Sequence, residues 1–139
     1  MADVVTSQTI VDTVWTKTVM KFTNISYGSG ETLVTKVDAS ALTFVTEDAN
    51  RVLAKIYWSV NTTNGKSGVE ILWAGSGDSA ANATIGFFSG RGFHDYFKDG
   101  NSIPNNSTLT ANTSPAGDIL FSTKGFVAGD NYTIILEIR

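Results

Sequence analysis

Apolar and polar residues alternate along most of this chain with a period of two, the spacing of a half-buried β-strand. The clearest case is Arg51–Val60, where we expect a core row of Val52, Ala54, Ile56, Trp58 and Val60. The same pattern predicts eight strands, at Val4–Val11, Trp15–Thr23, Thr32–Val37, Arg51–Val60, Val69–Trp73, Ala83–Phe88, Ile119–Thr123 and Tyr132–Ile138.

Turn residues separate these segments, because Gly, Asn and Asp cluster at Tyr27–Gly30, Asn64–Lys66 and Ala128–Asn131. The best candidate for a short helix is Asp38–Leu42, with Asp38 as its N-cap. Several short strands joined by turns are typical of a sandwich, a jelly roll or a barrel. Among these we predict a two-sheet antiparallel β-sandwich, jelly-roll-like, as a single domain over residues 1–139.

Two segments fit this pattern less simply. Ala2–Thr13 is β-prone and nearly uncharged, which predicts either an edge strand of the sandwich or an arm that adds to a neighbour's sheet. Lys98–Gly117 is polar and contains both prolines, so we predict a long loop, functional or mobile.

The charge of the chain excludes several classes of partner. Charged residues make up 17% of the sequence and the formal net charge is −3. The ten Lys and Arg residues are scattered singly, whereas nucleic-acid binding normally needs a basic patch. No polybasic anchor and no apolar run of about 20 residues occurs. We therefore expect neither nucleic acid nor a membrane as a partner.

Most catalytic and metal chemistry has no support in the sequence. There is no cysteine and only one histidine, His94, which argues against thiolate chemistry and against sites with two imidazoles. No phosphate loop, nucleophile elbow or zinc motif occurs. A pair of carboxylates for glycoside hydrolysis stays open, because such residues meet in space rather than in sequence. We expect no enzymatic activity, no cofactor and no metal, and the lack of cysteine and of a leader favours synthesis in the cytoplasm.

One stretch, Gly86–Phe97, combines five aromatic residues with Arg91, and interface hot spots are enriched in both. The alternative is that Phe87 or Phe88 completes the core while Phe93 and Phe97 close the end of the sandwich. Trp15 shares its predicted face with Lys17 and Lys21, so we expect it to be exposed. Our candidate interface residues are Val4, Val5, Ile10, Trp15, Phe87, Phe88, Arg91, Phe93, Tyr96 and Phe97.

The two ends of the chain carry a family resemblance. The residues concerned are Met1–Asp12, Val19–Ser26, Gly30–Thr32, Val34–Asp38, Gly117–Thr123 and Gly129–Glu137, somewhat under half of the chain. They resemble small virion structural proteins of tailed phages that infect marine bacteria, cyanophages especially. The resemblance supplies no catalytic residue.

The resemblance implies a capsid decoration (cement) protein on the capsid exterior, made in the cytoplasm of the bacterial host. The expected partner is the major capsid protein, and the expected state is a homo-oligomer, with a trimer favoured. A neck or tail component, and a carbohydrate- or receptor-binding module of a tail tip, are the alternatives.

Overall fold

The computed structural model describes residues 3–12, 17–38, 52–74, 83–96, 98, 103–104 and 118–139, and these contain ten β-strands and no helix. No helix long and apolar enough to cross a membrane is found among them. The strands are β1 (Val4–Asp12), β2 (Thr18–Ile25), β3 (Val34–Val37), β4 (Val52–Asn61), β5 (Gly68–Trp73), β6 (Ala83–Phe88), β7 (Gly90–Asp95), β8 (Ile103–Pro104), β9 (Ile119–Lys124) and β10 (Asn131–Ile138).

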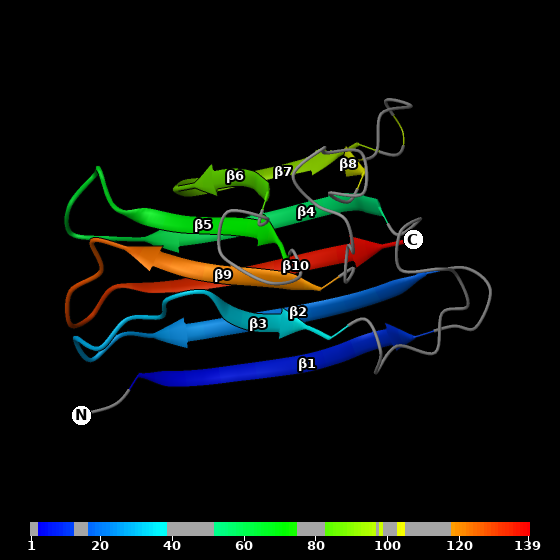
Figure 1. The fold of residues 1–139 in the computed structure, drawn as a ribbon. Helices are drawn as coiled ribbons and strands as arrows, with labels where there is room; N and C mark the ends of the chain where they lie inside the picture. Colours follow the sequence, from blue (N-terminus) through cyan, green and yellow to red (C-terminus); the bar gives the residue numbers. More distant parts are fainter. Residues whose placement is uncertain are drawn as a thin grey trace.

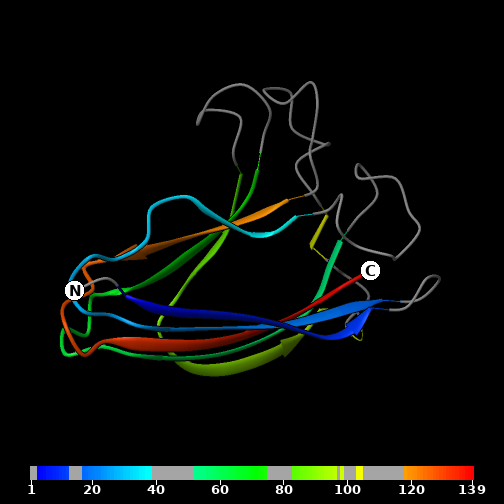
Figure 2. The same cartoon turned by 90° about the horizontal axis from the view of Figure 1, so that it is seen from below.

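The strands form two antiparallel sheets, which Figures 1 and 2 show as two layers. Sheet A has the order β1-β2-β10-β4-β7, with β8 pairing with one end of β4, and sheet B has the order β3-β9-β5-β6. The layers lie closest at the end where β2 connects to β3, β4 to β5 and β9 to β10 (Figure 2). The predicted antiparallel β-sandwich is confirmed, while jelly-roll connectivity stays a prediction.

The core lies between the sheets and follows the predicted alternation. The inward-facing residues of β10 are Tyr132, Ile134, Leu136 and Ile138, and all four are buried. Phe121 of β9 contacts the rings of Phe22 and Tyr132 edge-on, with ring centroids 5.3 and 5.8 Å apart. Since Phe22 and Tyr132 belong to sheet A and Phe121 to sheet B, this aromatic cluster joins the two layers.

The prediction that Val52 belongs to the core row of β4 is wrong. The register between β4 and β10 shifts after Glu137, so that Leu53 pairs with Ile138 and is fully buried. Val52 is only partly buried as a result. An extra residue in one strand reverses which side chains face the core, and regular alternation cannot reveal where this happens.

Strands β7 and β8 were not predicted. Both pair with β4 on the same side, β7 along Lys55–Val60 and β8 at Val52–Leu53. The glycines of β7 lower its strand propensity, and β8 lies within the stretch that we predicted to be a loop. The predicted helix lies outside the described residues except for Asp38.

The chain passes from sheet B to sheet A between β6 and β7, and Trp58 of β4 organises this corner. The indole Nε1 of Trp58 donates a hydrogen bond to the carbonyl of Ser89 at 3.1 Å, and its ring lies 5.0 Å from that of Phe88. Gly92 pairs with Trp58 across the strands. A Cβ at Gly92 would lie 2.2 Å from the indole, so glycine leaves the space that the ring occupies.

We predict that Gly92→Ala destabilises the protein by roughly 1–3 kcal/mol, the usual cost of overpacking. Gly65→Ala is the matched control, because a Cβ there has no atom within 4 Å, and its effect should stay within about 0.5 kcal/mol. Chemical unfolding of both variants measures the difference. Equal stabilities would show that the Trp58 ring moves without cost.

Candidate interaction surface

The face of sheet A that points away from sheet B carries a row of side chains, one from each of the strands β1, β2, β10, β4 and β7. Successive cross-strand partners across the sheet are Gln8, Lys21, Ile135, Tyr57 and Phe93, and we call this set the outer row. Directly opposed residues of an antiparallel sheet lie on the same face and contact one another. In Figure 2 this outer face is the lower surface of the lower layer.

The outer row ends in two exposed aromatic side chains. Tyr57 is 41% exposed and Phe93 is 62% exposed, and the two are direct partners across β4 and β7. Large aromatic side chains that stand together on a sheet face leave apolar area in water. This pair is therefore the strongest candidate contact on the outer face.

Polar residues border the outer row on one side. The neighbouring row consists of Thr6, Thr23, Thr133, Ser59 and Arg91. The hydroxyls of Thr6 and Thr23 hydrogen-bond to each other across β1 and β2. This row is rich in groups that form hydrogen bonds, and it includes Arg91, which lies on β7 like Phe93.

A charge cluster borders the outer row on the other side. The carboxylate of Glu137 lies 3.4 Å from Lys17 Nζ, 3.9 Å from Lys55 Nζ and 3.2 Å from Arg139 Nε, and Lys55 Nζ also lies 3.6 Å from Asp95. The hydrogen bond from the backbone N–H of Lys98 holds the pKa of Asp95 below its usual value, against desolvation and with help from Lys55. The cluster combines three cations with two carboxylates and forms a polar rim.

Strand β1 lies at the edge of sheet A, and among the described strands it pairs with β2 alone. Asp3 holds one end, since its carboxylate accepts the backbone N–H of Tyr27 at 3.0 Å. Asp12 holds the other end by accepting the hydroxyl of Thr18 at 3.0 Å. The N-terminal segment is thus an edge strand of its own sheet. Its candidate residues Val4, Val5 and Ile10 are all exposed.

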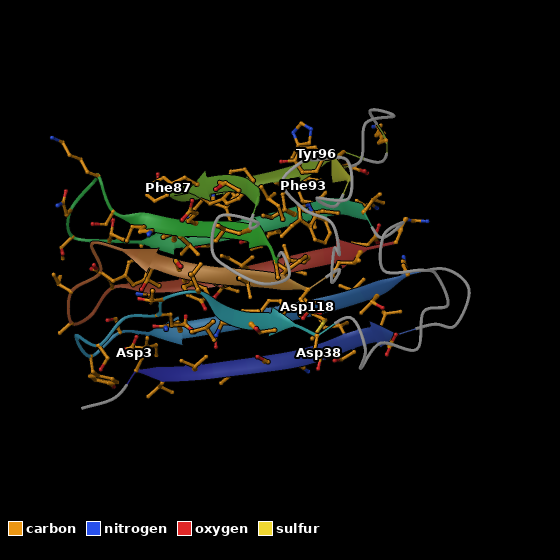
Figure 3. All side chains as sticks on the ribbon, viewed as in Figure 1. Asp3, Asp38, Phe87, Phe93, Tyr96 and Asp118 are labelled. Atoms are coloured by element: carbon orange, nitrogen blue, oxygen red, sulfur yellow. The ribbon has the colours of Figure 1, made fainter. Side chains whose placement is uncertain are left out.

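The predicted aromatic stretch does not form one patch. Phe88 belongs to the core, so it is not available to a partner, and Tyr96 packs partly buried against the core. Phe87 is exposed on β6 of sheet B, whereas Arg91 and Phe93 are exposed on β7 of sheet A. Figure 3 shows Phe87 well separated from Phe93 and Tyr96. Phe93 does not close the end of the sandwich, and Trp15 and Phe97 lie outside the described residues.

Sequence reasoning missed Tyr57 and Ile135, which complete the outer row. Both stand at positions where the alternation of their strands calls for a polar residue, since Ile56 and Ile134 face the core. An apolar residue at a position where the alternation points the side chain outward is the signal that would have identified them.

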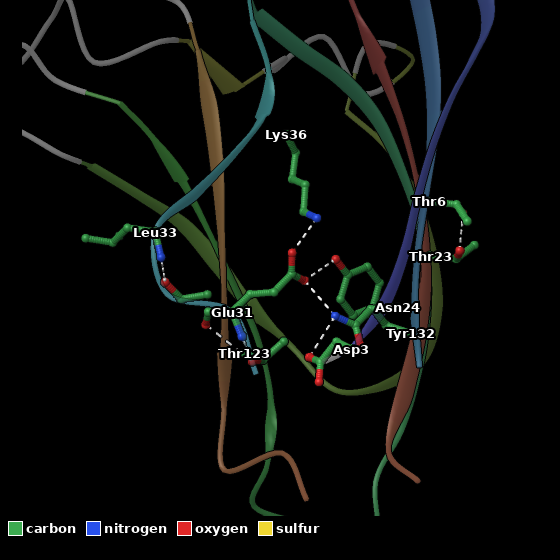
Figure 4. A network of polar contacts seen from close by, with 10 residues as sticks. Asp3, Thr6, Thr23, Asn24, Glu31, Leu33, Lys36, Thr123 and Tyr132 are labelled. Atoms are coloured by element: carbon green, nitrogen blue, oxygen red, sulfur yellow. Dashed lines mark hydrogen bonds and ion pairs between the residues drawn. The ribbon is translucent and has the colours of Figure 1, made fainter. Parts of the chain in front are cut away.

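A second polar feature lies inside the sandwich, around the carboxylate of Glu31 (Figure 4). Its Oε1 accepts the hydroxyl of Tyr132 at 2.6 Å and the amide Nδ2 of Asn24 at 3.0 Å. Its Oε2 forms an ion pair with Lys36. Glu31 is only 7% exposed and Lys36 only 8%. A charge with so little access to water is tolerated because it is paired and hydrogen-bonded.

The Glu31 cluster has the composition of an acid–base site, but its contacts argue for a structural role. Burial, and then the hydrogen bond and charge of Glu31, raise the pKa of Tyr132 far above its usual value. Tyr132 therefore stays protonated and acts as a donor. Both oxygens of the Glu31 carboxylate are engaged by these partners, so the cluster fastens the β2–β3 connection to β10.

No group of three or more His, Cys, Asp or Glu side chains in the described residues is placed to hold a metal ion. Comparison with known proteins produced no match, whether with family models, with curated proteins or with solved structures. The assignment of a site therefore depends on the geometry of the outer face and of the β1 edge.

We predict that Lys36→Met destabilises the protein by about 3–5 kcal/mol, because it leaves the Glu31 carboxylate buried without its cation. The double variant Glu31→Gln/Lys36→Met should lose much less than the sum of the two single changes, since a neutral amide needs no counter-charge. Urea unfolding of the four proteins in this cycle measures the coupling. If the losses in unfolding free energy were additive, Glu31 and Lys36 would not stabilise each other in the interior.

The stability of the protein should depend on pH through Asp3. Burial raises the pKa of Asp3, but hydrogen bonds from Tyr27, Asn24, Ser29 and Gly30 outweigh this and hold it below the ordinary 3.8. A lowered pKa in the folded state stabilises the protein above about pH 4, and this contribution disappears as the pH falls through the folded pKa. The advantage over Asp3→Asn in thermal unfolding should therefore be largest near neutral pH and vanish in acid. Parallel pH profiles of thermal stability for the two proteins would contradict this role of Asp3.

Proposed function

We propose that this protein is a structural component of a tailed-phage particle, a capsid decoration protein that binds the shell through the outer face of sheet A. The assignment to a phage particle rests on the resemblance of the chain ends to virion proteins. The observation that supports the contact surface is the exposed pair Tyr57 and Phe93, which stands on the outward face of a regular sheet.

The outer face has the layout of a protein–protein contact. Aromatic residues near the middle of such contacts contribute most of the binding energy, and polar residues around them exclude water. Here the aromatic pair lies between the hydroxyl-bearing row with Arg91 and the charge cluster around Glu137. Since these strands are paired on both sides except at the edges, the surface needs little rearrangement on binding.

The mechanism we propose is passive. Each copy makes a modest non-covalent contact with the major capsid protein, and the symmetry of the shell repeats that contact many times. Repetition raises the overall strength of attachment without a tight individual contact. No step of this mechanism requires a cofactor, a metal or a catalytic residue. The trimeric state that the resemblance implies stays a prediction.

A carbohydrate- or receptor-binding module of a tail tip is the second candidate. The adjacent rings of Tyr57 and Phe93 offer an apolar platform, and Arg91 and Asp95 lie on the same strand as Phe93. Ligand sites typically combine aromatic surface with a few polar groups in this way. A neck or tail component would use the same surface toward a different protein.

The copy number of the chain in purified particles separates these functions. Quantitative mass spectrometry against the major capsid protein should give a ratio near one, or a simple fraction of it, for a lattice protein. A ratio below a few per cent would replace the capsid role by a neck or tail role. Absence of the chain from particles would overturn the virion proposal altogether.

We predict that Phe93→Ala weakens binding to capsids stripped of this protein by about 30-fold, the equivalent of a hot spot of roughly 2 kcal/mol. Phe87→Ala is the matched control, because Phe87 is similarly exposed but lies on sheet B. Co-sedimentation measures both affinities, and thermal unfolding confirms that each variant folds. Equal losses in the two variants, or none in Phe93→Ala, would place the contact elsewhere.

A further inference from the structure

The open edge of β1 is a feature that the outer-face contact does not use. Strand β1 has nine residues and pairs with β2 only, so the backbone groups of its other side have no strand beside them in the described fold. The residues from Val4 to Val11 carry no charge and include no proline. An edge with these properties is a template for a further strand, and proteins usually protect against it.

The other strands at sheet edges in the described residues, β3, β6 and β7, carry such protection. Strand β6 has six residues, and its register with β5 shifts between Ile71 and Leu72. Strand β3 has only four residues, and its register shifts between Thr35 and Val37. Strand β7 carries Arg91, His94 and Asp95. Short length, register shifts and charges are the usual means of blocking edge-to-edge pairing. Strand β1 also has a register shift, between Thr9 and Val11, but the six residues Val4–Thr9 before it pair regularly and carry no charge, so this segment is suited to pairing.

Strand β1 is also already ordered by its contacts within its own sheet. Eight of its residues pair with β2, and the carboxylates of Asp3 and Asp12 fasten its two ends. A strand that is already ordered loses little conformational entropy when a second strand joins it. Asp3 and Asp12 lie outside the segment Val4–Thr9, where the pairing with β2 is regular.

We propose that β1 pairs antiparallel with β1 of a second copy of this chain, across a two-fold axis close to Ser7. In this arrangement Thr6 of each copy faces Gln8 of the other, and Val5 faces Thr9. No charged residue meets its like, and every contact occurs twice, as a two-fold interface requires. The occupant is a second copy because the uncharged segment is complementary to itself.

The pairing joins two copies of sheet A into one continuous sheet. A two-fold axis perpendicular to the sheet leaves the outer rows of both copies on the same face, so that each dimer presents two pairs of Tyr57 and Phe93. This dimer is independent of the virion role, and it differs from the trimer that the resemblance implies.

Single cysteines test the proposed register. The chain has no cysteine, so Ser7→Cys introduces the only thiol. Opposed residues in an antiparallel pair have Cα atoms about 4.5–5.5 Å apart, within the range of a disulfide. Under mild oxidation we expect a covalent dimer from Ser7→Cys, and from a mixture of Thr6→Cys and Gln8→Cys. Val127→Cys, exposed in the β9–β10 turn, should stay a single chain.

Charged substitutions test the same axis without a covalent bond. The full chain should have the mass of two copies by light scattering, and Ser7→Lys should be a monomer because its two lysines meet at the axis. A mixture of Ser7→Lys and Ser7→Glu should restore the dimer, and Val127→Lys should leave it intact. A single-chain mass at all concentrations, or a dimer that persists in Ser7→Lys, would overturn the proposal.

Discussion

The two sheets are held together through Tyr132, and the exposed surfaces depend on that attachment. Its ring contacts Phe121 of sheet B, while its hydroxyl donates to the buried carboxylate of Glu31, which also binds Lys36. Tyr132 lies on β10, the middle strand of sheet A, between β2 and β4. Hydrophobic contact and a charge-assisted hydrogen bond therefore act at one residue, and each requires the other sheet to be in place. With one face of β10 fixed in this way, its alternate residues must form the outer face.

The interior cluster and the outer face each contain a buried glutamate that is paired with cations. Inside, Glu31 and Lys36 are excluded from water, so their pairing is needed to offset the cost of burial. On the outer face, Glu137 is itself only 6% exposed, and its carboxylate lies 3.2–3.9 Å from three partly exposed cations, those of Lys17, Lys55 and Arg139. The Glu137 carboxylate therefore also depends on its cations to offset the cost of burial. The partly exposed cations keep the region beside the outer row polar, which suits the rim of a contact.

Much of the fold follows from the sequence, but the surfaces follow only in part. Alternation located the strands and the inward row of β10, because one buried face imposes a period of two. It did not reveal the register shift that buries Leu53 instead of Val52, nor β7, whose glycine opposite Trp58 makes sense only once the indole is placed. Glu31 and Tyr132 are 101 residues apart, so no local pattern could pair them. The prominence of Tyr57 depends likewise on the strand order β10-β4-β7.

Two departures from ordinary design occur on the same sheet. An antiparallel sheet with one face in water normally carries polar residues on that face, yet Tyr57 and Phe93 stand there exposed, as direct cross-strand partners. An edge strand normally carries a charge or an interruption, yet β1 is uncharged over its regular segment. Neither feature improves the core, because both lie outside it, and both expose the monomer to unwanted association. Natural sequences break such rules at functional positions. The two proposals are compatible with each other, since one places a second copy at the edge of sheet A and the other places a different partner on its outer face.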